Sequence, residues 1–368
     1  MISDTPALAG GTMQFEHQVI DPSTPGIQND ICLIADVNGD GYNDIIICGK
    51  RYEKNCVWYE YPSWKRHLIG TASTEAGGAA IDITGNGLPD IVAGHPGDAH
   101  PAAPGRELFW MENPGTDGGP WPKHLIHDIY EGQHHDQAVG DIDNDGKPEI
   151  IFAAQEAGII GYYDIPADPR QTPWPGECRH IICDDLKAVE GLVVADLDSD
   201  GEMELLAGPY WFKRRGDSWE KHVIDPTLVK TTAAVGDING DGKPEVILAE
   251  GESYPARLVW FGNAPAFDEA HLLADDLFHP HSLAVGDMDG DGLLDIFVGE
   301  MSLGKHPSKP RLMVYRNTGG GNFEQVIIDE GRHTHCAKIG DIGNTGRLSI
   351  VGKPFEPGNH VEMWLNRG

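Results

Sequence analysis

The chain has 368 residues, a formal net charge of −31 and 40% hydrophobic residues. This acidic excess excludes a nucleic-acid-binding surface, because a phosphate backbone needs Lys and Arg to neutralise it. No stretch approaches the roughly 18 apolar residues of a membrane-spanning helix. Residues 1–17 lack the basic and apolar regions of a signal peptide. We therefore expect a cytoplasmic protein, or a secreted one if a leader has been removed.

Glycine (47) and proline (26) are abundant and leucine-rich helical stretches are missing, which favours many short strands joined by turns. The six cysteines show no CxxC spacing, so we expect free thiols rather than disulfides or a metal site.

An Asp-initiated loop recurs seven times along the chain and organises the predicted fold. Five copies are complete: DVNGDGYND from Asp36, DIDNDGKPE from Asp141, DLDSDGEME from Asp196, DINGDGKPE from Asp237 and DMDGDGLLD from Asp287. Two are eroded: DITGNGLPD from Asp82 and DIGNTGRLS from Asp341. Each loop lies between two apolar runs, and an aromatic run and an HLI-like run usually complete the repeat, which predicts four short strands per repeat.

The two ends of the chain predict how these repeats close. After the seventh loop come only LSIVGKP and VEMWLNR, so the last repeat lacks its fourth strand. The segment FEHQVID, residues 15–21, has the pattern of that missing strand. We therefore predict that residues 1–368 form one all-β domain, a seven-bladed β-propeller whose last blade is completed by the N-terminal strand, which removes free sheet edges.

The acidic loops predict bound calcium. Oxygens at positions 1, 3, 5 and 9, with the position-7 carbonyl, can surround a hard cation, and Gly at position 6 permits the turn. Position 12 is apolar and the flanks are β-like, which excludes an EF-hand. The alternative is that the carboxylates only form Asx-turns at blade corners. We expect structural Ca²⁺ in the five complete loops and none at Asp82 or Asp341. The expected ligands are Asp36, Asn38, Asp40, Asp44, Asp141, Asp143, Asp145, Glu149, Asp196, Asp198, Asp200, Glu204, Asp237, Asn239, Asp241, Glu245, Asp287, Asp289, Asp291 and Asp295.

These DxNGDGxxD loops between strands resemble the FG-GAP/VCBS repeats of integrin-α-type propellers over essentially the whole chain. The resemblance implies the fold and says little about function, because adhesion modules, lectins, lyases and glycosidases share it.

The histidines divide into two groups. Six occupy the same slot in the predicted fourth strands and are expected to be structural: His17, His67, His124, His180, His222 and His271. A second set lies six residues before the first Asp of each loop, where the innermost strand begins. We expect these positions to ring the mouth of the central channel: Asp30, Ala76, His135, Glu190, Thr231, His281 and His335.

Loops that reach the same face add further polar and aromatic residues. The predicted catalytic group is His135, His134, Tyr210, His281, His335, His95, Glu190, Lys187 and Arg51. The predicted substrate-binding group is Trp211, Tyr254, His279, His333, Arg332, Lys353 and Lys230. A zinc or other divalent ion held by His135, His281 and His335 is a further hypothesis. The alternative to a site is a polar network around a water-filled channel.

Histidine and tyrosine can move protons near neutral pH, while Lys and Arg can neutralise a uronate or an enolate. This set of side chains predicts a carbohydrate lyase performing β-elimination on a uronic-acid-containing glycan or keto-sugar. Tyr210 and Trp211 are expected to stack on the sugar ring. The HHDQAVGDIDNDG and HPHSLAVGDMDGDG segments resemble propellers of fungal aldos-2-ulose dehydratase and rhamnose–glucuronate lyase type. That resemblance implies a central place for His134, His135, His281 and His335.

Two other functions stay open at this stage. A propeller glycoside hydrolase could use the pair Glu190 and Asp30, or the pair Glu156 and Glu252. A non-enzymatic carbohydrate-binding or adhesion propeller would need ligand contacts but no cluster of titratable groups. In each case a sugar or oligosaccharide is the expected partner, and the sequence carries no indication of oligomeric state.

Overall fold

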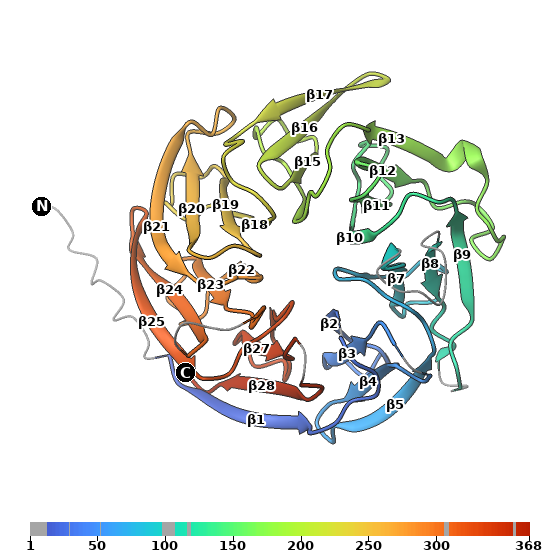
Figure 1. Ribbon diagram of the computed structural model, residues 1–368, viewed down its shortest axis with the longest axis horizontal. Coiled ribbons are helices and arrows are strands. Elements are labelled where there is room, and N and C mark those ends of the chain that lie inside the picture. The colour runs from blue at the N-terminus through green and yellow to red at the C-terminus, as the bar shows by residue number, and fades with distance from the viewer. Residues whose placement is uncertain are drawn as a thin grey trace, which may run out of the picture.

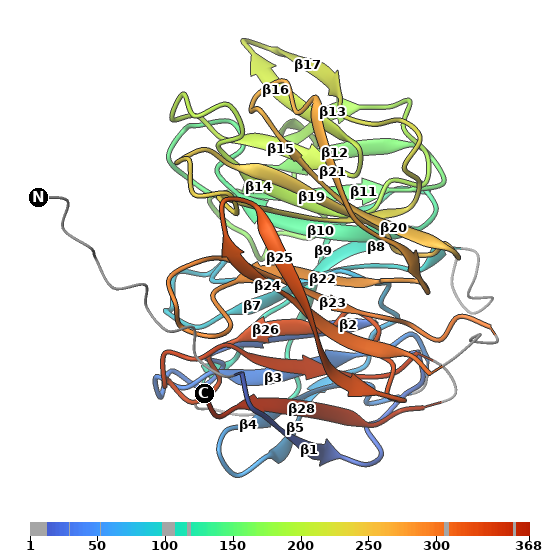
Figure 2. The ribbon, with the colours of Figure 1, turned by 90° about the vertical axis from the view of Figure 1, so that its left-hand side faces the viewer.

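The computed structural model describes residues 13–28, 30–51, 53–97, 107–115, 119–304, 309–355 and 358–368. Seven four-stranded antiparallel sheets surround a central axis, so the predicted all-β, seven-bladed propeller is confirmed (Figure 1). Seen from the side, the blades form one thick ring with loops on both faces (Figure 2). Among the described residues, no helix has the length and apolar character needed to cross a bilayer.

The strands of each blade run in chain order from the axis outward, and blade 7 joins both ends of the chain. Blade 1 contains β2 (Ile31–Ala35), β3 (Asp44–Cys48), β4 (Cys56–Glu60) and β5 (Lys65–Gly70). Blade 2 contains β6 (Ala79–Ile81), β7 (Asp90–Gly94), β8 (Glu107–Met111) and β9 (Lys123–Asp128). Blade 3 contains β10 (His134–Gly140), β11 (Glu149–Ala154), β12 (Ile159–Tyr163) and β13 (Arg179–Cys183), the last preceded by a 3₁₀ turn at Gly176–Cys178. Blade 4 contains β14 (Leu192–Ala195), β15 (Glu204–Ala207), β16 (Tyr210–Arg215) and β17 (Ser218–Val223).

The remaining blades follow the same plan. Blade 5 contains β18 (Thr231–Gly236), β19 (Glu245–Glu250), β20 (Ala256–Gly262) and β21 (Glu269–Leu277). Blade 6 contains β22 (Ser282–Gly286), β23 (Asp295–Gly299), β24 (Arg311–Gly319) and β25 (Asn322–Glu330). Blade 7 contains β26 (Lys338–Gly340), β27 (Ser349–Gly352), β28 (Val361–Asn366) and β1 (Phe15–Asp21).

The hydrophobic core lies between neighbouring blades. Every residue of β3, β7, β11, β19 and β23 is buried, because these second strands pack against a neighbouring sheet on each face. Ile46 of blade 1 and Ile91 of blade 2, for example, belong to one apolar cluster. The six cysteines form no disulfides.

Blade 7 is assembled from the two ends of the described chain. Strand β1 pairs antiparallel with β28, with Phe15 opposite Asn366 and Val19 opposite Glu362. Figure 1 shows β1 along the outer rim, with the C-terminus close to its start. Strand β1 therefore supplies the fourth strand of blade 7.

The outer strands carry a repeated stacking contact. In five blades a histidine of the fourth strand stacks on a Trp or Tyr of the third strand, with centroids 3.7–4.7 Å apart. In blade 7, His17 lies tilted over Trp364 at 5.3 Å. Each of these six histidines also contacts a carboxylate, as His124 contacts Glu112 at 3.0 Å. The outer histidines therefore join neighbouring strands, as expected of structural residues.

Replacing His124 with alanine should lower the free energy of unfolding by about 1–2 kcal/mol, because the stack on Trp110 and the Glu112 contact are both lost. Chemical denaturation followed by tryptophan fluorescence would measure this loss. His124→Phe keeps the stack and should recover part of the stability. Equal stabilities of the alanine variant and the wild type would contradict the structural role.

Candidate functional site

The seven Asp-initiated loops share one internal contact. In each loop the first Asp accepts backbone N–H bonds from positions 5 and 6, as Asp36 does from Asp40 (3.1 Å) and Gly41 (2.8 Å). The eroded loops at Asp82 and Asp341 keep this contact. The first Asp therefore holds the turn itself whether or not the loop has the other oxygens of a cation site.

The loop at Asp141 fits a hard cation. Carboxylate oxygens of Asp141, Asp143, Asp145 and Glu149 all lie within 4.8 Å of one another. Burial raises the pKa of Glu149 to about 7, and the neighbouring Asp charges act in the same direction. A divalent ion would relieve this repulsion, and an all-oxygen set is the kind that Ca²⁺ prefers.

The loop at Asp196 differs from the others, because a lysine side chain reaches into it. The ammonium group of Lys213, from β16, donates to Asp198 (2.5 Å), Asp200 (2.6 Å) and Glu204 (3.0 Å). The Lys213 side chain is only 3% exposed. A side-chain cation thus contacts three of the four residues predicted to bind Ca²⁺. Asp196, Asp198 and Glu204 still lie close enough together to hold an ion, so Lys213 and Ca²⁺ would compete for the same oxygens.

Replacing Lys213 with methionine should convert this loop into a calcium site. The variant should bind one more Ca²⁺ per chain than the wild type, measured by metal analysis after equilibrium dialysis. In calcium-free buffer it should melt at a lower temperature, because three carboxylates lose their counter-charge, and added Ca²⁺ should restore the melting point. Unchanged calcium stoichiometry would show that the ammonium group does not replace an ion.

The inner strands converge on an axial pocket of about 130 Å³. Its polar lining comes from five blades, 3 to 7, and comprises His135, Asp136, Gln137, Glu190, Thr232, His281, Ser282, Cys336 and Lys338. Four of the seven predicted ring positions line this pocket: Ala76, His135, Glu190 and His281. Gln137, Cys336 and Lys338 were missed by the sequence analysis, although each lies one to three residues after a ring position.

Glu190 lies between the two histidines. Its carboxylate oxygens are 3.9 Å from His135 Nε2 and 3.9 Å from His281 Nε2. The histidine ring centroids are 6.3 Å apart, and His135 Nδ1 lies 3.0 Å from Asp136 Oδ2. The two imidazoles therefore share one carboxylate, and only His135 has a second one.

This asymmetry moves the two histidine pKa values apart. Burial alone would lower the pKa of His135, but the carboxylates of Glu190 and Asp136 outweigh it and hold that pKa well above its usual value. Burial lowers the pKa of His281, and the positive charge of His135 lowers it further. The carboxylate of Glu190 raises it, but not enough to offset these two effects. Near neutral pH one imidazole is thus protonated and the other neutral, which is the arrangement of an acid–base pair.

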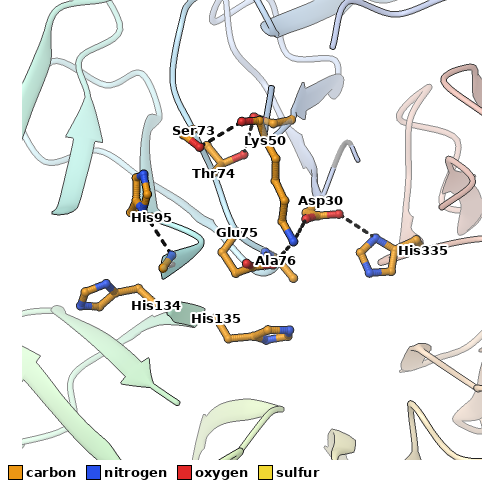
Figure 3. A network of polar contacts seen from close by, with 12 residues as sticks. Asp30, Lys50, Ser73, Thr74, Glu75, Ala76, His95, His134, His135 and His335 are labelled. Atoms are coloured by element: carbon orange, nitrogen blue, oxygen red, sulfur yellow. Dashed lines mark hydrogen bonds and ion pairs between the residues drawn. The ribbon is translucent and has the colours of Figure 1, made fainter. Parts of the chain in front are cut away.

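A buried polar network from blades 1, 2 and 7 lies beside the pocket (Figure 3). Lys50 bridges Asp30 at 2.8 Å and Glu75 at 2.7 Å. His335 Nδ1 lies 3.1 Å from Asp30 and 3.0 Å from the fully buried Lys353 Nζ. Burial alone would raise the pKa of Asp30, but His335 and Lys50 hold it well below its usual value. Asp30 therefore stays ionised and cannot donate a proton.

The predicted metal-binding trio is divided by this network. The structure groups His281 with His135 and Glu190 on one side, and with His335 and Cys336 on the other. His335 turns toward Asp30 and does not line the pocket. The hypothesis of an ion on His135, His281 and His335 together is therefore replaced by two overlapping trios that share His281. Both contain the nitrogen, oxygen or sulfur donors that a divalent transition metal accepts.

A second pocket of about 160 Å³ lies between blades 4 and 5, beside the axial one. Lys187, Tyr210 and Lys230 line it, and Glu190 lines both pockets. Lys230 also forms an ion pair with Glu252. Tyr210 was predicted to belong to the catalytic group with His135, but it lines this neighbouring pocket, because it begins β16, the third strand of its blade.

His134 needs a similar correction. It begins β10 beside His135, and successive side chains of a strand face opposite ways. Figure 3 shows the two rings pointing in opposite directions. His134 is fully buried against His127, with the two Nε2 atoms 3.0 Å apart, and does not line the axial pocket.

Trp211 was expected to stack on a sugar ring, but its indole is 4% exposed and stacked on His222 at 4.0 Å. Arg332 pairs with Asp329 at 2.9 Å instead of facing the axis. The other predicted site residues that line neither pocket are Arg51, His95, Tyr254, His279, His333 and Lys353.

A closed ring of four-stranded blades, with an acidic loop between the first and second strand of each blade, defines a class of β-propellers. Comparison with known families places the chain in the same class. The model of the FG-GAP-like repeat matches residues 36–93, 82–152 and 209–298, more than half of the chain. The chain therefore belongs to the FG-GAP-like repeat family.

Among curated proteins, the chain is similar to aldos-2-ulose dehydratase of Phanerodontia chrysosporium, with 29% identity over 166 residues. This match covers 40% of the chain and only 17% of that protein.

Solved structures show the same fold. The BBS1N protein in its complex with ARL6DN gives a TM-score of 0.60 at 9% identity and covers 96% of both chains. The V. cholerae biofilm matrix protein Bap1 gives a TM-score of 0.53 at 10% identity, covering 97% of this chain and 92% of that one. At these identities the similarity extends to the fold alone.

Proposed function

We propose that this propeller is a carbohydrate-active lyase that performs β-elimination on an acidic sugar or keto-sugar in the axial pocket. The observation that carries the proposal is the pair His135 and His281, which share Glu190 and have pKa values displaced in opposite directions. β-Elimination needs one group to take a proton and another to give one, and this pair supplies both.

In this scheme neutral His281 takes the proton from the carbon next to the carboxylate or carbonyl of the sugar. The released electron pair forms the carbon–carbon double bond as the bond to the leaving oxygen breaks. Protonated His135 donates its proton to that oxygen, and Glu190 orients both imidazoles. Lys338 at the pocket and Lys187 in the neighbouring pocket supply positive charge for the substrate carboxylate.

Two further observations support this proposal. The dehydratase to which the chain is similar bears a name that denotes loss of water from a keto-sugar, the same class of elimination. The trio His135, Glu190 and His281 also fits a divalent ion, which when bound would stabilise the negative charge of an enolate.

For the acidic loops we propose structural Ca²⁺ at Asp36, Asp141, Asp237 and Asp287. These loops have the carboxylate and amide oxygens of a calcium site, and the loop at Asp141 shows their convergence. Their role would be to hold the turns at the blade corners, at a distance from the chemistry of the axial pocket.

Incubation with uronate oligosaccharides tests the function. A lyase should produce ultraviolet absorbance of an unsaturated uronate together with one new reducing end per cleavage. New reducing ends without that absorbance would instead identify a hydrolase. Binding measured by calorimetry without any product would identify a carbohydrate-binding propeller, and the proposal would then be wrong.

A further inference from the structure

A second histidine cluster lies away from the axial pocket, at the junction of blades 2 and 3. His127 ends β9, Glu131 lies in the following loop, and His134 begins β10. The three side chains belong to a stretch that the proposed chemistry does not use. His127 is 3% exposed, Glu131 7% and His134 0%, so the cluster is enclosed.

The three facing atoms are spaced like ligands of one ion. His127 Nε2 and His134 Nε2 lie 3.0 Å apart, and Glu131 Oε2 lies 3.9 Å and 3.6 Å from them respectively. Ligands at about 2.1 Å from a tetrahedral zinc ion are about 3.4 Å apart. The observed spacings lie on either side of this value, so small side-chain shifts would give ordinary metal–ligand distances.

His127 Nδ1 and Glu131 Oε1 already have hydrogen-bond partners. These bonds hold His127 Nε2 and Glu131 Oε2 toward each other. His127 Nδ1 lies 2.8 Å from the hydroxyl of Tyr163, and Glu131 Oε1 accepts a bond from Arg179. Glu131 Oε2, by contrast, is buried and has no hydrogen-bond partner in the described part of the chain. A buried carboxylate oxygen without a donor is costly unless a cation faces it.

Hydrogen bonding within the protein satisfies this cluster only in part. A single proton can be shared between the two Nε2 atoms, and it leaves Glu131 Oε2 unpaired. A divalent ion would accept both nitrogens and the oxygen at once. Tyr163 and Arg179 would then act as the outer partners that orient the ligands, an arrangement common around protein metal sites.

We propose that His127, Glu131 and His134 bind a divalent transition-metal ion of the zinc class, which clamps blade 2 to blade 3. Two imidazoles and one carboxylate favour such an ion over Ca²⁺, which prefers oxygen ligands. The enclosure of the cluster favours a structural role. This site is independent of the proposed lyase activity and of the acidic loops.

Cobalt binding tests the proposal, because Co²⁺ substitutes for zinc and its visible absorbance reports coordination. The titration uses chelator-treated His281→Gln protein, which lacks the residue shared by both axial trios, in millimolar Ca²⁺ to occupy the loops. One Co²⁺ per chain should bind with a nitrogen–oxygen spectrum. Glu131→Gln is then added, because glutamine is nearly equal in size to glutamate but carries no charge. Loss of an outer partner typically weakens metal binding about 10–100-fold, and loss of this ligand should weaken Co²⁺ binding by more than that.

Tyr163→Phe on the same background serves as a second variant, since it removes one hydroxyl and keeps the ring. It should weaken Co²⁺ binding about 10–100-fold while the protein remains folded. Absence of Co²⁺ absorbance in the His281→Gln protein would overturn the proposal. A spectrum and affinity unchanged by either substitution would overturn it as well, because the ion would then be bound elsewhere.

Discussion

Replacing His135 with alanine should lower turnover on the true substrate by about 10²–10⁴-fold, the usual cost of losing a general acid–base group. His135 is the proposed proton donor, and its imidazole faces Glu190 at 3.9 Å and Asp136 at 3.0 Å. Removing it leaves the leaving oxygen without a proton source, while His281 remains. Initial rates of unsaturated-product formation would measure the loss.

His124→Ala is the matched control for this experiment, because His124 belongs to the outer-strand stack and does not contact the axial pocket. It should lose stability and keep its rate at temperatures where it is folded. His135→Ala should show the opposite pattern, with an unchanged calcium content. Full activity of His135→Ala would remove this residue from the mechanism.

The pH dependence follows from the same pair. As pH rises through the pKa of His281, which is lowered below 6.5, the base becomes neutral and kcat/KM should rise. As pH rises further through the pKa of His135, which is raised above 6.5, the acid loses its proton and kcat/KM should fall. A bell-shaped profile is therefore expected. A rate that rises steadily with pH would exclude His135 as the acid.

Deleting residues 1–22 should prevent formation of a stable ring. The deletion removes β1 and exposes the paired edge of β28, including the backbone beside Met363 and Trp364, which are now 1% exposed. An open edge of this kind promotes aggregation. Size-exclusion chromatography and thermal unfolding should show aggregates or loss of a cooperative transition.

A shorter deletion of residues 1–12, which leaves β1 whole, is the control and should behave like the full chain. A peptide of residues 13–22 added to the longer truncation should restore part of the folded population. A soluble monomer with the native melting temperature after deletion of residues 1–22 would show that β1 contributes little to ring closure.

The fold could be predicted almost completely because each sequence repeat corresponds to one four-stranded blade. Each loop has the same position relative to its flanking strands, so a constant offset of six residues identified the positions where inner strands begin. That offset placed His135, Glu190 and His281 around one axis. The stacking histidines were predicted for the same reason, since a residue in a fixed slot of every blade has the same surroundings.

What could not be predicted depends on the direction of individual side chains. His134 and His135 are neighbours in sequence, yet strand alternation turns one into the blade junction and the other toward the axis. Trp211 lies one residue from Tyr210, but its face is covered by His222. Lys213 reaches the Asp196 loop from the third strand of its blade, and the loop sequence alone gives no sign of it.

The pairing of β1 with β28 also determines how the ring responds to mechanical load. Because the strands are antiparallel and Phe15 lies opposite Asn366, the two ends of the described chain emerge side by side. A pull applied to these ends would peel the strands apart one pair at a time, from Phe15–Asn366 toward Asp21–Val361, instead of shearing all their hydrogen bonds together. The ring should therefore open at low force through blade 7, while the six blades built from continuous chain remain folded.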